Sequence, residues 1–509
     1  MSSEYVFEMR NITKIFPGIV ANDNITLQVK QGEVHALLGE NGAGKSTLMS
    51  VLFGMYEPEK GSIYVRGKKV AIKNPSEANR LGIGMVHQHF KLVDDFTTLE
   101  NIVLGVETTK HGVLKMDEAQ EKVLALSSKY GLAINPDSKV HDISVGMQQR
   151  VEILKMLYRD NDILIFDEPT AVLTPQEIDE LMKIMRNLAN EGKSIVFISH
   201  KLNEIKRVAD RCTVLRKGKY VDTVDVDKAT PEMLSRMMVG RNVQLVVEKD
   251  KANPGEPVLE VRDLCVKGIN SQKNKVSNVS FQARKGEITC IAGIDNNGQT
   301  ELVLALAGMI PSTGSIRLNG EEISDKTVRY RNTHGMSHIP EDRQKHGLIL
   351  EFNLAENLIM QNYFTDEFNR KGFLRFDKVF AYANELIQRY DIRSGKGAVN
   401  RVRAMSGGNQ QKAILAREIT RDHDLLIAVQ PTRGLDVGAI EYIHKQLIKE
   451  RDAGKAVLLI SLELDEVMDV SDRILVIHEG EIVADVLPED VTFDELGLYM
   501  SGTKRGKVE

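Results

Sequence analysis

The chain contains two copies of one sequence pattern, and this duplication limits its possible folds more than any other feature. Residues 39–54, GENGAGKSTLMSVLFG, return in altered form at residues 293–308, GIDNNGQTELVLALAG. Three further pairs follow in the same order: SVGMQQR at Ser144 and SGGNQQK at Ser406, DEPT at Asp167 and VQPT at Val429, and ISHKLNE at Ile198 and ISLELDE at Ile460. Four motifs repeated in one order predict two tandem domains of the same architecture.

Within each copy, short apolar runs alternate with helical patterns. Residues 34–38, 163–166 and 194–199 are continuous apolar runs, which are typical of buried parallel strands. After DEPT, we expect a helix with Thr174 as N-cap, Pro175 at its first position and Glu177 closing a capping box. Its apolar positions follow a helical period: Ile178, Leu181, Met182, Met185 and Leu188. The alternation indicates the α/β class.

The domain boundaries follow from the repeat. We expect a first domain at 5–243, a linker at 244–257, a second domain at 258–500 and a tail at 501–509. The linker contains KDKANPGEP, a charged stretch with proline and glycine.

Composition excludes several classes of function. A net charge of -5 argues against a surface that seeks nucleic acid. No apolar run approaches the roughly 18 residues of a membrane span, and MSSEYVFEMR lacks the apolar core of a signal peptide, so we expect the chain in the cytoplasm. Cys212, Cys265 and Cys290 lie far apart, two of them in apolar runs, which favours buried reduced thiols over a disulfide or a metal site.

The segment from Gly39 onward fits the phosphate-loop pattern G-x-x-x-x-G-K-[ST], after an apolar run and before a helical pattern. Glycines let backbone N–H groups surround phosphates, the lysine reaches the terminal phosphates and the serine offers an oxygen to magnesium. The expected nucleotide contacts in this segment are Gly39, Glu40, Asn41, Gly42, Ala43, Gly44, Lys45, Ser46 and Thr47.

Polar residues follow two of the expected strands. Asp167 can hold the magnesium shell, and Glu168 beside it can orient and deprotonate an attacking water. Taken alone, these acids are equally compatible with a solvated strand end. His200 can contact the terminal phosphate, although a lone histidine is more often structural, and Gln88 alone would be only a loop amide.

Together these motifs resemble the ABC ATPase family over nearly the whole chain. Gln88 matches its Q-loop, Ser144 to Met147 a signature, and Asp167, Glu168 and His200 the Walker B and switch positions. The resemblance implies two P-loop domains, each with a parallel-sheet ATPase core, an antiparallel β part and a helical signature subdomain. It also implies ATP and Mg²⁺ as cofactors, with Phe16 stacking on adenine and Ser46, Gln88 and Asp167 around the metal. Its catalytic residues would be Lys45, Gln88, Glu168 and His200.

The family's head-to-tail ATP sandwich implies two composite sites, and departures from the pattern fall in only one of them. Site one combines the first domain's motifs with Ser406, Gly407, Gly408 and Asp436 of the second. Site two departs from the pattern at each motif position: Gly268 for the aromatic, Gln299 for the lysine, Glu341 for the Q-loop glutamine, Val429 and Gln430 for the acids, and Leu462 for the histidine. The signature that faces it is Ser144 to Met147, and Thr174 takes the place that Asp436 has in site one. We expect hydrolysis at site one alone.

The fused domains, with MSGGNQQK and PEDR in the second, resemble importer subunits for monosaccharides and nucleosides. In that subgroup, sugar importers typically carry arginine at the second phosphate loop and an acidic DEPT in the second Walker B. Gln299, Val429-Gln430 and SVGMQQR in the first signature resemble the nucleoside branch instead, with ribose-type or galactose-type sugar import as the alternative. The resemblance implies two permease subunits, an extracellular or periplasmic substrate-binding lipoprotein, and a position at the cytoplasmic face of a bacterial membrane. Permease helices would dock near residues 88–104 and 341–358, where Phe90, Leu92, Phe96 and Phe352 fit core and docking roles equally well.

Two other classes remain as alternatives. Twin-domain ABC proteins of ribosomes or DNA would carry a long basic or helical insert, which this sequence lacks, and a scaffold without turnover conflicts with the complete first set of motifs.

Overall fold

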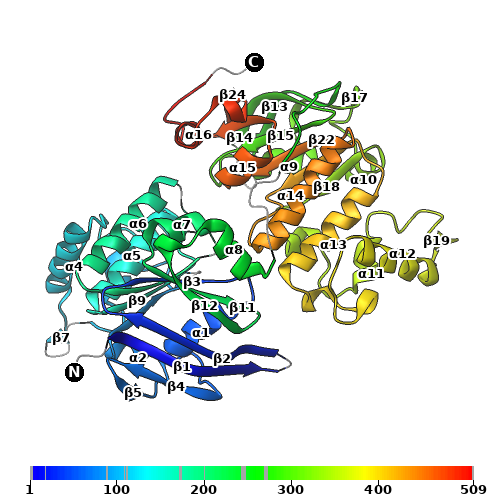
Figure 1. Ribbon diagram of the computed structural model, residues 1–509. Helices are drawn as coiled ribbons and strands as arrows, with labels where there is room; N and C mark the ends of the chain where they lie inside the picture. Colours follow the sequence, from blue (N-terminus) through cyan, green and yellow to red (C-terminus); the bar gives the residue numbers. More distant parts are fainter. Residues whose placement is uncertain are drawn as a thin grey trace. The chain divides into compact units, whose positions relative to one another are not determined.

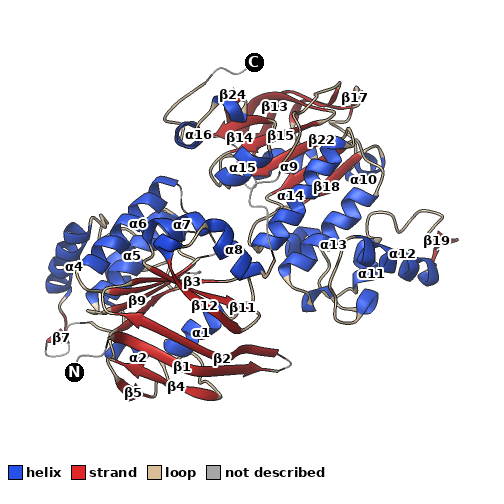
Figure 2. Cartoon of the chain, in the orientation of Figure 1, coloured by secondary structure: helices blue, strands red, loops and turns tan. Residues whose placement is uncertain are grey.

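A computed structural model describes residues 4–17, 19–87, 90–107, 109–110, 113–170, 173, 175–199, 201–241, 248–268 and 273–506. The chain divides into two compact units, Met1–Val243 (unit 1) and Gln244–Glu509 (unit 2) (Figure 1). In each unit, most of the helices gather on one side of the strands, and some strands lie at the outer edge of the unit (Figure 2).

The described residues of unit 1 form two large sheets and the two-stranded sheet β7-β8. The antiparallel sheet has the order β2-β1-β4-β5, and the mixed sheet, mainly parallel, has the order β12-β11-β3-β10-β9-β6. The strands are β1 (Tyr5–Phe16), β2 (Ile19–Lys30), β3 (Val34–Leu38), β4 (Lys60–Val65), β5 (Lys68–Val70), β6 (Ile83–Val86), β7 (Thr109–Lys110), β8 (Val113–Leu114), β9 (Ile163–Asp167), β10 (Ser194–Ile198), β11 (Arg211–Arg216) and β12 (Lys219–Asp225).

The helices of unit 1 connect these strands. They are α1 (Lys45–Leu52), α2 (Pro75–Arg80), α3 (Thr98–Val103), α4 (Met116–Tyr130), α5 (Val145–Tyr158), α6 (Pro175–Asn190), α7 (Leu202–Val208) and α8 (Pro231–Val239), with 3₁₀ turns η1 (Val140–Asp142) and η2 (Val226–Lys228). Helix α1 packs between the two sheets, because Leu48 and Met49 share a core with Phe7 of β1 and Ile165 of β9. The phosphate loop is thereby fixed at both ends, by β3 and by α1.

Unit 2 repeats this plan. Its two large sheets have the orders β14-β13-β16-β17 and β18-β21-β22-β15-β23-β24, and β19 and β20 form a two-stranded sheet. The strands are β13 (Pro257–Lys267), β14 (Asn274–Arg284), β15 (Glu287–Ala292), β16 (Thr313–Leu318), β17 (Glu321–Glu322), β18 (Met336–Ile339), β19 (Asn369–Arg370), β20 (Phe373–Leu374), β21 (Leu425–Val429), β22 (Ala456–Ser461), β23 (Arg473–His478) and β24 (Glu481–Val486). The helices are α9 (Gln299–Leu306), α10 (Val328–Thr333), α11 (Leu354–Leu358), α12 (Phe376–Arg389), α13 (Gly407–Thr420), α14 (Val437–Asp452), α15 (Leu464–Val470) and α16 (Phe493–Met500), with short turns η3 (Arg343–Gly347), η4 (Gly397–Val399), η5 (Val402–Ala404) and η6 (Pro488–Asp490).

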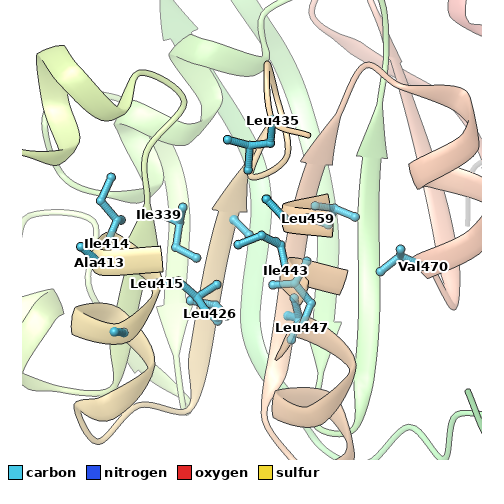
Figure 3. Packing of buried hydrophobic residues seen from close by; sticks show 14 of the residues in the cluster. Ile339, Ala413, Ile414, Leu415, Leu426, Leu435, Ile443, Leu447, Leu459 and Val470 are labelled. Carbon is cyan, nitrogen blue, oxygen red and sulfur yellow. The ribbon is translucent and has the colours of Figure 1, made fainter. Parts of the chain in front are cut away.

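The parallel strands of unit 2 are buried on both faces. On one face, Leu426 of β21 and Leu459 of β22 pack against Ile414 of α13 and Leu447 of α14 (Figure 3). On the other face, Ile427 belongs to a second core with α9 and the antiparallel sheet. Burial on both faces explains why these strands are continuously apolar in the sequence.

The expected α/β class is confirmed, and the three apolar runs form β3, β9 and β10. In the expected helix after DEPT, which is α6, Leu181, Met182, Met185 and Leu188 are buried. Thr174 lies outside the described residues. Cys212 and Cys290 are buried, and burial raises the pKa of each thiol to about 12.

Two segments at the edges of unit 2 make specific contacts. In the expected linker, Lys249 pairs with Asp472 at 3.0 Å. After α16, the Gly506 N–H donates to the Val483 carbonyl at 2.8 Å, and Lys504 pairs with Glu495 at 2.9 Å.

Candidate functional site

The phosphate loop of unit 1 lies between β3 and α1, as its motif requires. Gly42 has φ 80° and Gly44 has φ 93°, a left-handed conformation that favours glycine. A Cβ on Gly44 would also stand 2.4 Å from the Ala21 carbonyl oxygen. The buried Lys45 donates from Nζ to the carbonyl of Gly39 at 2.7 Å and to that of Glu40 at 3.1 Å. Its ammonium group therefore lies within the loop that would surround phosphates.

Ser46, Asp167 and Glu168 come together beside this loop. The Ser46 hydroxyl donates to Asp167 Oδ1 at 3.1 Å, which joins the start of α1 to the end of β9. Burial is the main reason why the pKa of Asp167 is raised to about 6, and the Glu168 charge raises it further. The Ser46 hydrogen bond and the Lys45 charge act in the opposite direction. A desolvated carboxylate next to a hydroxyl, at the edge of a phosphate loop, is the oxygen donor set that suits Mg²⁺.

Glu168 is held in a left-handed backbone conformation, with φ 47°. Its N–H donates to the Ile198 carbonyl of β10 at 3.0 Å. A non-glycine residue is uncommon in this region, and such strain is concentrated at functional sites. The turn fixes where the glutamate leaves the sheet edge, directly after Asp167.

Gln88 and His200 lie outside the described residues, but the segment before His200 is connected to the Walker B end. Glu204 of α7 accepts hydrogen bonds from Ser199 Oγ at 2.8 Å and from Thr170 Oγ1 at 2.9 Å. Sequence reasoning missed Glu204. The signal was present, because both ISHKLNE and ISLELDE end in glutamate, and Glu466 likewise accepts from Thr432 Oγ1 at 2.8 Å.

Phe16, the expected adenine-stacking residue, is half-buried at the end of β1. It meets Tyr56 edge-to-face, with ring centroids 5.2 Å apart, and Lys14 Nζ lies 5.4 Å from its ring centroid. Tyr56 is exposed and was not singled out from the sequence, where no pattern marks it.

Unit 2 keeps the same backbone with different chemistry. Gly298 has φ 99° and Gln430 has φ 42°, close to the values at Gly44 and Glu168. Gln299 replaces the lysine, and its Nε2 donates to the Ile294 carbonyl at 2.9 Å. Val429 is a buried strand residue where unit 1 has Asp167. The backbone of the phosphate loop is therefore retained, with an amide in place of Lys45 and a valine in place of Asp167.

Glu341 brings a carboxylate to this end of the sheet. It accepts from Gln430 Nε2 at 3.0 Å, from Arg433 Nη1 at 2.7 Å and from Thr300 Oγ1 at 3.4 Å. Thr300 is the counterpart of Ser46, and its hydroxyl donates to Glu341, whereas the Ser46 hydroxyl donates to Asp167. We call Thr300, Glu341, Gln430 and Arg433 the Glu341 network.

The signature residues stand at helix starts in both units. Ser144 caps α5 by accepting from the Met147 N–H at 3.3 Å. Ser406 precedes α13, and its Oγ accepts from Asn409 Nδ2 at 2.9 Å. Asp436 caps α14 by accepting from the Ala439 N–H at 2.8 Å. The N–H groups at the start of α13 make its first turn, with Gly407 and Gly408, suited to an anion.

The fold and the Lys45–Ser46–Asp167 cluster define a P-loop nucleotide-binding protein with two tandem units. The ABC transporter family model matches residues 22–171 and 276–433, and the chain belongs to this family. It is 54% identical to the nucleoside import ATP-binding protein NupA of Lactococcus lactis, with 99% of each chain covered. It is 56% identical to the guanosine import ATP-binding protein NupO of Bacillus subtilis, with 98% of each covered.

More distant relatives carry sugar names. The glucose import ATP-binding protein TsgD13 of Haloferax volcanii is 42% identical, with 99% of this chain and 96% of the relative covered. Among solved structures, a dimeric bacterial ABC transporter cassette is 28% identical, with 43% of this chain and 98% of that chain covered and a TM-score of 0.40.

The predicted family is therefore confirmed, and so is the prediction that the chain is an ATP-binding ATPase of the ABC type. Within the described part of the chain, no helix has both the length and the apolar character that a membrane crossing requires.

Proposed function

We propose that the chain hydrolyses ATP to energise solute import through membrane permeases, and that the solute is a nucleoside. The observation that carries the ATPase role is the junction of Lys45, Ser46 and Asp167 at one edge of the unit 1 sheet. The full-length similarity to proteins named for nucleoside and guanosine import supports the transport role.

In the proposed mechanism, the phosphate loop binds the triphosphate through backbone N–H groups, and Lys45 moves from the loop carbonyls to the terminal phosphates. Glu168, fixed by its left-handed turn, orients the attacking water and takes its proton. Gln88 and His200 complete the set as groups that sense and contact the terminal phosphate.

Ser46 and Asp167, with Gln88, would hold Mg²⁺. Their hydrogen bond places a hydroxyl and a buried carboxylate side by side, which fits a small hard cation. The ion, when bound, neutralises charge that develops on the transferred phosphate. Coordination by Asp167 would also stabilise its ionised form, which burial in the protein disfavours.

We propose further that the hydrolytic site is composite: unit 1 supplies the loop and the acids, and unit 2 supplies Ser406, Gly407, Gly408 and Asp436. The Glu341 network supports this asymmetry. A carboxylate already paired with Arg433 stands where the second site would need a neutral glutamine and a metal. The proposed domains are 5–243 and 258–500, with the linker 244–257 and the tail 501–509.

The proposed partners are two permease subunits and an extracellular or periplasmic substrate-binding lipoprotein, with the chain at the cytoplasmic face of a bacterial membrane. Phe96 is 38% exposed and Phe352 is 46% exposed, so neither belongs to a core. Exposed aromatic side chains in the segments 88–104 and 341–358 support docking of permease helices there.

Sugar import is the second candidate, because relatives at 42% and 37% identity are named for glucose and for ribose or galactose. The higher identity to nucleoside and guanosine proteins favours nucleosides. Uptake of labelled nucleosides and pentoses in cells that lack the chain tests this choice. Loss of nucleoside uptake, restored by the wild-type gene and not by Glu168→Gln, is expected; loss of pentose uptake alone would overturn it.

A further inference from the structure

The two signature turns lie against groups of different charge. In unit 2, the guanidinium of Arg343 packs against the turn formed by residues 406–408. Arg343 Nη2 lies 2.9 Å from the position that a Cβ on Gly407 would take. Arg343 Nη1 donates to the Arg433 carbonyl at 2.9 Å, in the loop that leads to Asp436. Arg343 therefore bridges the signature turn and the loop 431–436 of its own unit.

The Arg343 guanidinium is partly withdrawn from water. Its Nε is buried and has no hydrogen-bond partner among the described residues. Burial is also the main reason why the pKa of Arg343 is lowered. The Arg433 charge lowers this pKa as well, and the Asp342 charge raises it. Arg343 is part of PEDR, the motif that sequence analysis found in the second copy alone.

In unit 1, a carboxylate stands at the signature turn. Any Cβ on Gly146 would collide with Glu177 Oε1, so this carboxylate lies directly against the start of α5. Arg150, one turn further along α5, is paired with Glu180 at 2.7 Å. The sequence predicted Glu177 as a member of a capping box on α6; the structure adds its contact with the signature turn.

Aligning the two copies shows that the charge difference arises at matched positions. Gly146 corresponds to Gly408 and Glu177 to Ala439, and Phe90 stands where unit 2 has Arg343. A Cβ on Gly408 would lie 3.4 Å from Ala439 Cβ and 3.9 Å from Asp436 Oδ2, and the Asp436 carboxylate is engaged as the cap of α14. Unit 2 has thus gained a guanidinium and lost a carboxylate at this turn.

These groups act on a helix start, where exposed N–H groups already favour an anion. A carboxylate at that point takes the place of a bound anion and repels another, whereas a guanidinium adds to the attraction. In the proposed composite site, the turn with the guanidinium belongs to the unit that would complement the complete motifs of unit 1. The turn with the carboxylate would face the degenerate motifs of unit 2.

We propose that Arg343 is a positioning residue for ATP hydrolysis, which holds the signature turn 406–408 and the loop 431–436 in a phosphate-accepting arrangement and raises the positive potential there. Glu177 has the opposite effect and excludes triphosphate from the signature turn of unit 1. This inference deepens the proposed function, because it rests on the composite site.

The test uses the purified full chain with Mg²⁺ and ATP. Arg343→Ala is expected to lower kcat/KM about tenfold, mainly through KM, since hydrogen bonds to charged groups contribute effects of this order. Arg343→Lys, which keeps the charge and loses the fork, is expected to restore part of the loss. Ala439→Glu places a carboxylate at the matched position of unit 2 and should also raise KM, whereas Glu177→Ala should leave kcat/KM unchanged.

A binding measurement separates this inference from the proposed function. In a Glu168→Gln background, which removes the proposed base, equilibrium ATP affinity should fall about tenfold with Arg343→Ala and with Ala439→Glu. Unchanged affinity and unchanged KM in both variants, with the wild-type unfolding midpoint, would overturn the role of Arg343. Turnover that persists in Glu168→Gln alone would instead overturn the proposed hydrolytic site.

Discussion

Replacing Asp167 with asparagine tests the electrostatic description of the unit 1 site. The pKa of Asp167 is raised from 3.8 to about 6, mainly by burial. Between pH 3.8 and about 6, Asp167 is therefore mostly protonated in the folded protein and mostly ionised in the unfolded chain. Stability from the neutral carboxyl is full below pH 3.8 and is lost as pH rises through about 6. The total loss is about 3 kcal/mol, at 1.36 kcal/mol for each unit of pKa shift.

The asparagine variant has no such titration, so its stability relative to wild type should rise with pH. Between pH 5 and pH 7.5 the expected rise is about 1.4 kcal/mol, since about half of the loss at Asp167 occurs below pH 5. Urea unfolding without nucleotide, followed by protease cleavage and mass spectrometry of peptides from β9 and β10, would report unit 1 specifically.

Ser46→Ala is the matched control. It removes the hydrogen bond that lowers the pKa of Asp167 and leaves this residue buried. The loss of stability with rising pH should therefore occur at higher pH in Ser46→Ala than in wild type, and should not disappear. A difference between wild type and Asp167→Asn that stays constant from pH 5 to pH 7.5 would refute the raised pKa. The stabilisation that Mg²⁺ and ATP give to wild type should instead grow with pH through this range, because Asp167 is proposed to bind Mg²⁺ in its ionised form.

Three further outcomes are expected. Glu168→Gln should lower steady-state phosphate release by on the order of 10² to 10⁴, and adding Gln430→Glu should not restore it; substantial release from the single variant would contradict the proposal. Leu447→Ala, in the core between α14 and the unit 2 sheet, should lower the free energy of unfolding of unit 2 by about 2–5 kcal/mol in urea, and a smaller loss would contradict tight packing around Leu447. Cys212 and Cys290 should resist alkylation at pH 8 in the folded protein and react fully in urea; rapid native labelling would contradict their burial.

The repeat and the phosphate-loop pattern were enough to predict the α/β class and the strands that carry Lys45 and Asp167. These predictions succeed because the alternation of apolar runs and helices fixes the order of elements, and the ends of parallel strands meet at one sheet edge. The identity of Glu168 as a strand-end acid was visible in the sequence. Its left-handed backbone was not, because local strain depends on the surrounding fold.

Side-chain partners between distant segments could not be predicted. Glu341 was recognised only as a departure from glutamine, whereas its bonds to Gln430 and Arg433 depend on how three loops approach each other in the folded unit. Arg343 was seen as one letter of PEDR, and its contact with Gly407 is a tertiary fact. For Phe96 and Phe352, which fitted a core or a surface equally well, exposure now excludes the core.

The Glu341 network makes the divergence of the two copies difficult to reverse. A glutamate restored at residue 430 would face the Glu341 carboxylate, at a place where an amide now donates to it. A glutamine at residue 341 would replace the charged partner of Arg433 with a neutral amide. Each single step toward the motif of unit 1 therefore costs a present contact before any catalytic gain. Natural selection acting on one substitution at a time would preserve the copy that we propose to be inactive, and an engineer would need to change these positions together.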